Sequence, residues 1–379
     1  MRVAGLIALI LFAGCSATPQ PAPPDPNAFE TDAKGAAAIV DQTLTLDGLG
    51  QPIGFVSAVA RCGDLLLFAD SSGQVRRHLV VTGETLPSIA RDAANLALAV
   101  DCATRGVYVF GPAAGRSQRG RLQVTAFDVD TGAQRRVYPL ELMMLPDWNA
   151  AVADGALVVG GTWMPLPTDG KYQHPPLSAF YSDKKLGVRM ALDSGVATPW
   201  LPPFDPSCRA HCPFSTLSRI VGHEPLAWLA TQASSKQVAL YDAGGVVNRR
   251  FDITSPLFAD DGSVLRTLGG EPDVRWSARN SLVKSADQFG EVVATIHYRT
   301  RLPADYVFGQ STEFDYWMNL HGLDGRRLVS DIKLPGMPIG GDDTHIYVTD
   351  YGPDGRHGAP DRLKILRIPV VVGTEGFRH

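Results

Sequence analysis

Few residues of this 379-residue chain have the types and spacing that catalysis needs. His223-Glu224-Pro225 lacks the second histidine of the zinc-binding helix motif, and its proline would break the required helix. The nucleophile elbow of serine hydrolases, Gly-x-Ser-x-Gly, does not occur. Residues 111–117 fall short of a phosphate-binding loop, because arginine replaces the lysine and one spacer residue is missing. We therefore predict no catalytic residue and no cofactor.

Two acidic pairs, Asp260-Asp261 and Asp342-Asp343, could supply the oxygen ligands that Ca²⁺ prefers. We interpret them as turn residues, since aspartate and the glycine at 262 favour tight turns. The segment CRAHC at 208–212 has neither the regular spacing of a zinc site nor the CxxCH of haem attachment. No metal site is predicted.

Aromatic and basic residues gather in four long polar segments, and these are the residue types that anchor protein interfaces. The candidate binding residues are Arg116, Arg119, Trp163, Tyr172, His174, Tyr306, Phe308, Phe314, Tyr351, Arg356 and His357. The alternative is that these side chains only cover the ends of strands.

The elements that position these residues are predicted to be short β-strands. Six runs rich in β-branched and aromatic residues begin 41 to 70 residues apart. They cover residues 65–70, 106–111, 156–161, 226–231, 292–298 and 345–350. Turns containing aspartate and glycine recur near residues 132, 195, 245 and 325, where hairpins need positive φ angles. No long helical periodicity is found.

Six such units predict an all-β fold over residues 41–372, a six-bladed β-propeller with four-stranded antiparallel blades. Residues 42–47 have no blade of their own, so we expect this N-terminal strand to close the last blade beside residues 362–368. Residues 373–379 form a tail. Seven blades or a pair of β-sandwiches are the alternatives. The repeat pattern resembles that of TolB-like and NHL-like propellers, which implies the same fold.

The predicted topology sorts the loops onto two faces. Connections from the second to the third strand of a blade lie on the same face as connections to the next blade. The long segments 111–121, 161–176, 299–314, 351–361, 201–216 and 255–272 all fall on this face, so we expect binding there. From the innermost strands, Ser57, Asn149, Ser218 and Arg275 are expected to face the central channel.

Five cysteines are present, and the four after Cys15 indicate disulfides in an exported chain. Three pairings are possible. Cys62 and Cys102 occupy equivalent turns of adjacent blades on the face without long loops, so we favour Cys62–Cys102, with Cys208–Cys212 closing a small loop.

The first residues have the pattern of a secretory signal, with Arg2 before an apolar run, residues 3–13, that is too short to span a bilayer. Residues 12–15, Phe-Ala-Gly-Cys, resemble the bacterial lipoprotein signal, which implies removal of residues 1–14 and lipidation of Cys15. Residues 15–40 are then a proline-rich tether. Ser16 in place of aspartate implies the outer membrane, facing the periplasm or the cell surface. A plain secretory signal is the alternative.

These patterns predict a lipid-anchored, non-enzymatic binding or scaffold module of the bacterial envelope with a protein, peptide or glycan partner. The net charge of −4 argues against nucleic-acid binding. The alternative is an extracytoplasmic hydrolase or lyase with a metal at the channel mouth. Three or more converging carboxylates or histidines in a deep axial pocket would favour that alternative, whereas a shallow aromatic surface would favour binding.

Overall fold

The computed structural model describes residues 38, 40–47, 56–90, 97–113, 122–140, 142–165, 185–202, 205, 215–220, 227–263, 265, 270–310, 312–350 and 362–370. The chain divides into two units, Met1–Ala33 and Lys34–His379, and every described residue belongs to the second. For residues 46, 47, 90, 142–149, 162–165, 215, 220 and 362 only the backbone is described.

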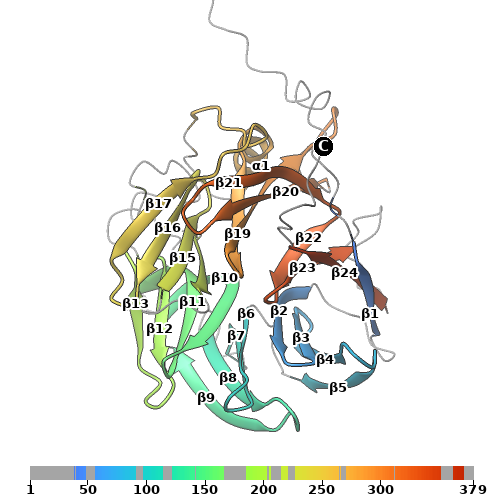
Figure 1. Cartoon of the computed structure of the whole chain (residues 1–379), viewed down its shortest axis with the longest axis vertical. Coiled ribbons are helices and arrows are strands. Elements are labelled where there is room, and N and C mark those ends of the chain that lie inside the picture. The colour runs from blue at the N-terminus through green and yellow to red at the C-terminus, as the bar shows by residue number, and fades with distance from the viewer. Residues whose placement is uncertain are drawn as a thin grey trace, which may run out of the picture. The chain divides into compact units, whose positions relative to one another are not determined.

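The second unit is a six-bladed β-propeller of four-stranded antiparallel blades arranged in a ring (Figure 1). Blade 1 contains β2 (Val56–Cys62), β3 (Leu65–Asp70), β4 (Gln74–Leu79) and β5 (Thr85–Ala90). Blade 2 contains β6 (Ala97–Asp101), β7 (Gly106–Pro112), β8 (Leu122–Asp128) and β9 (Gln134–Leu140). Blade 3 contains β10 (Leu142–Ala153), β11 (Ala156–Pro165), β12 (Gly187–Ala191) and β13 (Ala197–Trp200).

Blade 4 contains β14 (Ser215–Ile220), β15 (Ala227–Gln232), β16 (Gln237–Asp242) and β17 (Val247–Asp252). Blade 5 contains β18 (Leu282–Phe289), β19 (Val292–Arg301), β20 (Glu313–Gly322) and β21 (Arg327–Leu334). Blade 6 contains β22 (Met337–Gly341), β23 (His345–Asp350), β24 (Arg362–Pro369) and β1 (Gln42–Asp47).

Strand β1 closes the ring, as the sequence predicted. It pairs antiparallel with β24 in a register that places Leu44 opposite Ile365. Leu44 and Ile365 are both buried in a cluster that also contains Val56 and Phe68 of blade 1. The two ends of the propeller are therefore joined within one sheet, and β1 covers the edge of β24 that would otherwise be unpaired.

Aspartates and glycines shape the turns between third and fourth strands. Asp128 accepts hydrogen bonds from the backbone N–H groups of Asp130 and Thr131, at 3.0 and 2.8 Å. The Thr131 and Arg135 bonds hold the pKa of Asp128 well below its usual range. Gly132 follows with φ of 72°, and Gly195, Gly245 and Gly325 have φ between 78° and 83° at equivalent positions. These positive angles favour glycine, and they confirm the predicted turn pattern.

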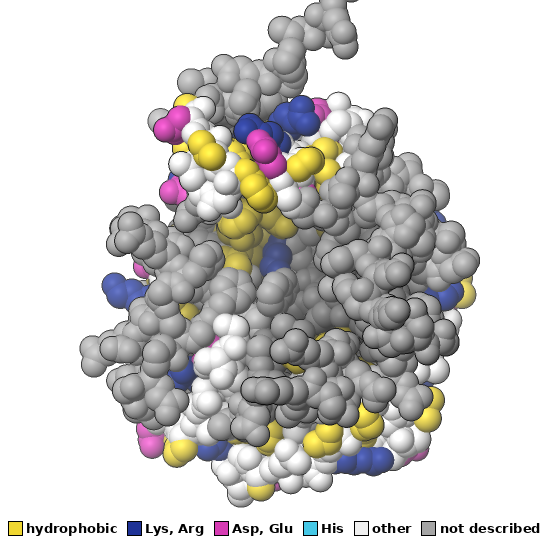
Figure 2. All heavy atoms as spheres, turned by 180° about the vertical axis from the view of Figure 1, so that it is seen from behind, with side chains coloured by type: hydrophobic (Ala, Val, Ile, Leu, Met, Phe, Trp, Pro, Cys, Tyr) yellow, Lys and Arg dark blue, Asp and Glu magenta, His cyan; other side chains and the backbone are white. Residues whose placement is uncertain are grey.

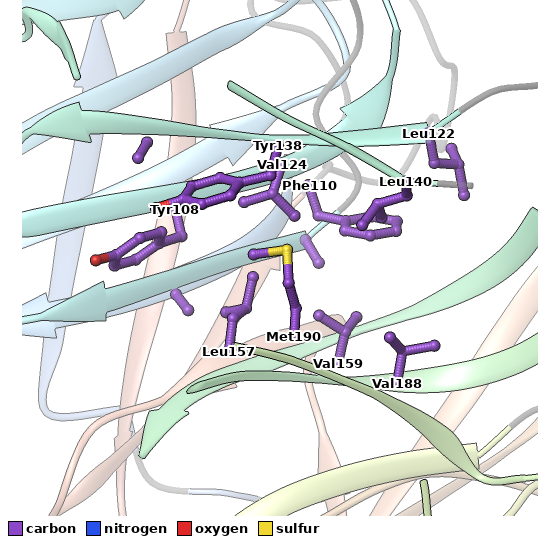
Figure 3. Packing of buried hydrophobic residues seen from close by; sticks show 13 residues of the cluster. Tyr108, Phe110, Leu122, Val124, Tyr138, Leu140, Leu157, Val159, Val188 and Met190 are labelled. Atoms are coloured by element: carbon purple, nitrogen blue, oxygen red, sulfur yellow. The ribbon is translucent and has the colours of Figure 1, made fainter. Parts of the chain in front are cut away.

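The core lies between neighbouring blades, because each sheet has two faces to bury. Between blades 2 and 3, Tyr108, Phe110 and Val124 pack against Leu157 and Met190 (Figure 3). Polar side chains add links from one blade to the next at the rim of the ring. The Tyr138 hydroxyl donates to the carbonyl of Leu192 at 2.9 Å, and Arg77 Nη1 donates to the carbonyl of Asp130 at 2.6 Å.

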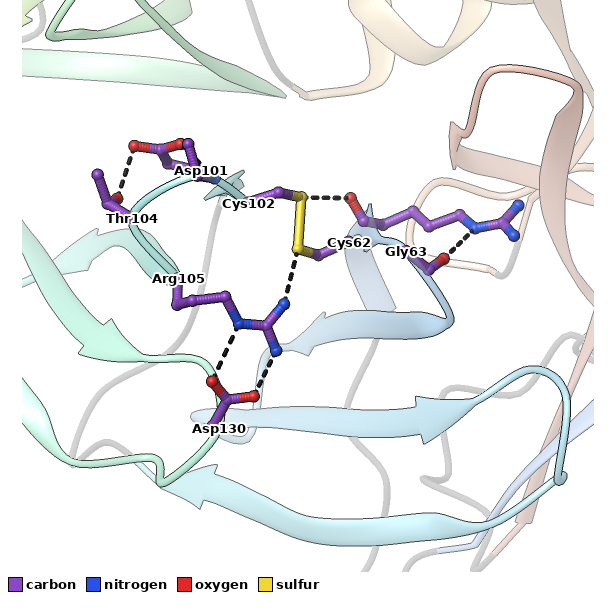
Figure 4. Close-up of a disulfide and its surroundings, with 9 residues drawn as sticks. Cys62, Gly63, Asp101, Cys102, Thr104, Arg105 and Asp130 are labelled. Carbon is purple, nitrogen blue, oxygen red and sulfur yellow. Dashed lines mark hydrogen bonds and ion pairs between the residues drawn. A yellow bond between two sulfur atoms is a disulfide. The ribbon is translucent and has the colours of Figure 1, made fainter.

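A disulfide links Cys62 and Cys102, as the sequence predicted, with 5.4 Å between the Cα atoms. Cys62 ends β2 and Cys102 follows β6, so the bond joins the first turns of blades 1 and 2 (Figure 4). Arg105 donates from Nη1 to the Cys62 sulfur at 3.2 Å and also pairs with Asp130. Cys208 and Cys212 lie outside the described residues.

Removing this disulfide should lower the stability of the folded protein. We expect Cys62→Ser with Cys102→Ser to lower the free energy of unfolding by about 2–4 kcal/mol, because the crosslink restricts the unfolded chain. Urea unfolding with and without a reductant is the measurement. An unchanged urea midpoint in the double variant would contradict the prediction.

The helix α1 (Gly270–Arg279) was not predicted, and it corrects the expected position of Arg275. The segment joins blades 4 and 5 and buries Trp276, Ser277 and Ala278 against the propeller. Arg275 lies on this helix and forms an ion pair with Glu271 at 2.7 Å, so its placement on an innermost strand was wrong. The innermost strand of blade 5 is β18. Among the described residues, no helix is long and apolar enough to span a membrane.

Candidate functional site

The strands that flank the long connections end on one face of the ring, which we call the loop-bearing face. The connections β7–β8, β11–β12, β19–β20 and β23–β24 join second to third strands, as predicted. Most candidate binding residues on them lie outside the described residues: Arg116, Arg119, Tyr172, His174, Tyr351, Arg356 and His357. Trp163 lies on β11, and only its backbone is described.

The β19–β20 connection and the start of β20 expose a group of apolar side chains that we call the aromatic ridge: Val307, Phe308 and Phe314. Their exposed fractions are 63%, 53% and 48%. The Phe314 ring contacts Tyr298 edge-on, with 5.8 Å between ring centroids. Figure 2 shows hydrophobic side chains between basic and acidic ones at the top of the molecule, where α1 lies in Figure 1.

Tyr306 lies in the same connection as Val307 and Phe308 but is packed inward. It is buried, and the Arg275 guanidinium lies 5.7 Å from its ring centroid. Ser277 on α1 and Thr300 on β19 share a buried hydrogen bond of 2.8 Å between their hydroxyl oxygens. Helix α1 therefore packs against the base of the β19–β20 connection. Tyr306, a candidate binding residue, is part of this packing.

A polar cavity of about 710 Å³ lies between blades 4 and 5 beside α1. Its walls include Asp205, Ser235, Lys236, Asp260 and Asn280. Ser235 donates to Asp205 at 2.5 Å, and Asn280 accepts from the Asp261 backbone N–H at 2.8 Å. Asp260 and Asp261 also accept from N–H groups two residues ahead, so this acidic pair shapes a turn.

A second cavity, of about 820 Å³, lies on the axis of the ring, and we call it the channel cavity. The innermost strands of all six blades line it, through Val59, Leu98, Ala150, Ser218, Gln288 and Ile339 among others. Gly63, Cys102 and Thr344 also line it, so it lies where first strands turn into second strands. This end is opposite the loop-bearing face.

A hydrogen-bonded pair crosses from blade 4 to blade 5 in the channel cavity. Ser218 Oγ donates to Asp287 Oδ1 at 2.6 Å. Burial raises the pKa of Asp287, although bonds from Ser218 and Ser285 and the charge of Lys284 act in the opposite direction. Ser218 therefore lies in the channel as expected. Ser57 is buried and donates to the Ala69 carbonyl, whereas the Asn149 side chain is not described.

A second polar network joins blade 6 to blade 1. Asp342 Oδ2 accepts from Arg61 Nη1 at 2.8 Å and from the Tyr347 hydroxyl at 2.5 Å. Asp342 Oδ1 accepts from the N–H groups of Thr344 and His345, at 2.8 and 3.0 Å. Burial opposes ionisation, but these donors hold the pKa of Asp342 far below its usual range. The acidic pair 342–343 thus closes a turn and also binds the neighbouring blade.

The channel cavity contains Asp287, Asp342 and Asp343. Within the part of the chain that the structure describes, no three histidine, cysteine or acidic side chains come together as metal ligands. The channel cavity therefore has the size and polarity expected of an enzyme pocket on the axis. Its described carboxylates do not converge.

The channel cavity also contains Arg61, Arg219 and Asp287, which were not predicted from the sequence. A single signal could have located one of them, because Gly290 and Glu291 form the turn between β18 and β19, with Gly290 at φ of 59°. This turn comes directly before the apolar run 292–298, so the innermost strand of blade 5 must lie on the N-terminal side of the turn.

Comparison with known proteins supports the fold. No family model matches the sequence, and no curated protein matches it. The chain is similar to a crystal structure of a DUF4221 family member from Bacteroides vulgatus, with 10% identity and a TM-score of 0.60 over 88% of this chain and 98% of that one. It is also similar to the RRP9 WD40 repeats, with 10% identity and a TM-score of 0.46 over 88% and 99% of the two chains. The Cps50 (Swd1) β-propeller domain of Myceliophteria thermophila matches at 10% identity and a TM-score of 0.42, over 87% and 99%. The first of these similarities, at such low identity, supports the six-bladed β-propeller fold and nothing finer.

Proposed function

We propose that this protein is a lipid-anchored binding module that docks a protein partner on its loop-bearing face. The observation that carries the proposal is the aromatic ridge, in which three apolar side chains between residues 307 and 314 are about half exposed or more. Exposed aromatic side chains in a group, edged by charged residues, are typical of protein interfaces. The ion pairs Arg275–Glu271 and Arg301–Glu313 supply that charged edge.

The ridge also has the rigidity that an interface needs. Phe314 is the second residue of β20 and packs on Tyr298, and the buried Tyr306 ring lies beside the Arg275 guanidinium. Side chains that are already fixed lose little conformational freedom when a partner binds. A propeller fold suits this role, because its blades form a stable frame for the connections at their ends.

A capture experiment tests the docking face. The native protein is crosslinked to its protein partner in its own cell envelope, and the amount of captured partner is measured. We expect the double variant Phe308→Ser, Phe314→Ser to capture at least about tenfold less partner than the wild type, since aromatic anchors dominate interface energies. Val246→Ser is the matched control, because Val246 is 61% exposed on the opposite face. A partner that stays with the ridge variant, or capture that requires an intact glycan, would contradict the proposal.

Lipid anchoring at Cys15 is the second part of the proposal. The resemblance of residues 12–15 to the lipoprotein signal supports it, and a disulfide such as Cys62–Cys102 fits an oxidising compartment outside the cytoplasm. Two or more acyl chains bind a membrane stably, whereas one chain gives only reversible binding.

Replacing the lipidated residue should release the protein. We expect Cys15→Ser to move the protein from the membrane pellet to the soluble fraction, whereas Ser16→Ala leaves it in the pellet. Fractionation with detection by antibody is the measurement. If Cys15→Ser remains in the pellet through washes with salt, a lipid at Cys15 does not anchor this protein.

A further inference from the structure

The disulfide Cys62–Cys102 exposes its two cysteines unequally. Cys102 is exposed and lines the channel cavity of about 820 Å³, which is large enough for a small organic molecule. Cys62 is 4% exposed and is not among the described residues that line this cavity. A small thiol that enters the cavity therefore meets Cys102 first, and the sulfur of the buried Cys62 becomes the leaving group.

Arg105 places a cationic hydrogen-bond donor on Cys62 (Figure 4). Its Nη1 donates to Cys62 Sγ at 3.2 Å, and its Nε and Nη2 both bind the carboxylate of Asp130. The carboxylate offsets part of the positive charge, but it also fixes the guanidinium with Nη1 directed at the sulfur. A donor of this kind favours a thiolate over a thiol, and a less basic thiolate leaves faster. The donor thus lies on the sulfur that must leave when Cys102 is attacked.

The junction between blades 1 and 2 does not depend on the disulfide alone. Arg77 Nη1 on blade 1 donates to the carbonyls of Val129 and Asp130 on blade 2, at 3.1 and 2.6 Å. Leu67 of blade 1 and Leu98 of blade 2 are buried in one apolar cluster. We therefore expect the two blades to stay packed when the disulfide opens, so that exchange takes place in the folded protein.

We infer that Cys102 is a site of reversible S-thiolation, where a small thiol exchanges with the Cys62–Cys102 disulfide. The attacking thiolate forms a new S–S bond to Cys102 Sγ, the bond to Cys62 breaks, and its electron pair stays on Cys62 as a thiolate beside Arg105. The attacking sulfur is oxidised and the Cys62 sulfur is reduced, so the step needs no other oxidant. This site lies on the face opposite the proposed docking surface and does not depend on it.

Mapping the mixed disulfide shows which sulfur is attacked. The oxidised full chain is treated with 2-mercaptoethanol, quenched in acid and mapped by mass spectrometry. It carries Cys15→Ser, Cys208→Ser and Cys212→Ser, so that one pair of cysteines reacts. We expect at least about fivefold more adduct on Cys102 than on Cys62, because exchange follows access to the sulfur. A smaller excess on Cys102, or no adduct before urea unfolds the protein, would overturn the inference.

A pair of arginine variants tests the leaving group. Arg105→Gln should slow formation of the adduct about fivefold or more, because Cys62 then leaves without its cationic donor. Arg135→Gln is the matched control and should keep the rate within about twofold. Arg135 is exposed and donates to the Thr104 carbonyl at 2.9 Å, so it binds the turn that contains Cys102 without a recorded bond to sulfur. An unchanged or faster rate in Arg105→Gln, with the fold intact by circular dichroism, would overturn the inference.

A second measurement separates this effect from a loosened turn. When Cys102→Ser is added to the same background, Cys62 is the one cysteine left, and the ultraviolet absorbance of its thiolate gives the ionised fraction at a fixed pH. Adding Arg105→Gln should lower this fraction about threefold or more, because the thiolate loses its donor. An equal thiolate fraction with and without Arg105 would show that the arginine does not stabilise the leaving group, and the inference would fail.

Discussion

Lowering the pH from 7.5 to 4.5 should cost this protein about 5 kcal/mol of folding free energy through two buried histidines of blade 5. His297 and His321 are fully buried, on β19 and β20. Burial lowers the pKa of His297 to about 3 and the pKa of His321 to about 4. In the unfolded chain both imidazoles titrate near pH 6.5.

The surroundings of His297 explain why its protonation is unfavourable. Asn319 Oδ1 accepts from the Asp331 backbone N–H at 3.0 Å, which orients the Asn319 amide so that its Nδ2 donates to His297 Nδ1 at 3.1 Å. A proton on Nδ1 would therefore face a donor. The ring also lies between Phe258 and Trp317, with centroid distances of 5.2 and 5.5 Å. His321 packs on Phe251 at 5.3 Å.

Acidification should destabilise the folded protein, because protons bind the unfolded histidines more tightly than the folded ones. Between about pH 6.5 and the folded-state pKa values, the unfolded chain binds more protons than the folded protein, so stability falls as the pH falls. Each histidine should contribute about 2–3 kcal/mol of this loss by pH 4.5. Asp287 acts in the opposite direction, because its raised pKa lets the folded protein take up a proton early. The test therefore compares variants, not absolute stabilities.

Urea unfolding at several pH values between 7.5 and 4.5 measures this dependence. In the wild type, the two histidines together cause a loss of unfolding free energy between pH 7.5 and 4.5. We expect His297→Gln and His321→Gln each to reduce that loss by about half, because glutamine keeps a polar group there but does not titrate. Asp287→Asn, measured in parallel, removes the opposing contribution. If the double histidine variant loses as much free energy on acidification as the wild type, these histidines do not set the acid sensitivity.

How far the sequence predicts this fold depends on how each strand is buried. The second strands of the blades, such as Leu65–Asp70, are buried on both faces and therefore appear as continuous apolar runs. The innermost strand of blade 5, Leu282–Phe289, interrupts its apolar residues with Asp287 and Gln288, because one edge of this strand faces the channel. Helix α1 buries one aromatic side chain, Trp276, in an otherwise polar segment, which leaves little periodic signal.

The two candidate sites also differ in how far the sequence predicts them. The aromatic ridge lies within one short segment, residues 307–314, so residue types alone indicated Phe308 and Phe314. Tyr306 in that connection is buried because the chain packs over α1, a contact between segments that the sequence does not reveal. The channel cavity takes a few residues from each of six blades. Arg219 and Asp287 are distant in sequence, and only the closed ring brings them to one cavity.

Ring closure itself depends strongly on Asp342, and Asp342→Asn should lower the free energy of unfolding by about 3–5 kcal/mol. The side chain of Asp342 is 2% exposed, whereas that of its partner Arg61 on blade 1 is 33% exposed. Its two oxygens accept five hydrogen bonds, from Arg61, Tyr347, the backbone N–H groups of residues 344 and 345, and the Thr344 hydroxyl. Asparagine would turn an NH₂ group toward one set of these donors and leave buried donors without an acceptor.

The packing next to Asp342 gives the junction little room to adjust. Gly340 has φ of 135°, and a Cβ atom there would lie 2.7 Å from Val59 Cγ1 on β2. Blades 6 and 1 are thus in close backbone contact beside the ion pair. A rearrangement that satisfied the new asparagine would have to move β22 against β2, so the lost hydrogen bonds are not easily replaced.

Asp343→Asn is the matched control, since Asp343 is the exposed neighbour of Asp342 and should change stability by less than about 0.5 kcal/mol. Hydrogen exchange adds a local measurement. In Asp342→Asn, amides of β1, β22 and β24 should exchange faster than in the wild type, whereas those of β15 and β16 in blade 4 should follow the global change alone. Equal destabilisation by both variants, or uniform exchange around the ring, would mean that blade 6 is held to blade 1 by β1 and apolar packing without this carboxylate.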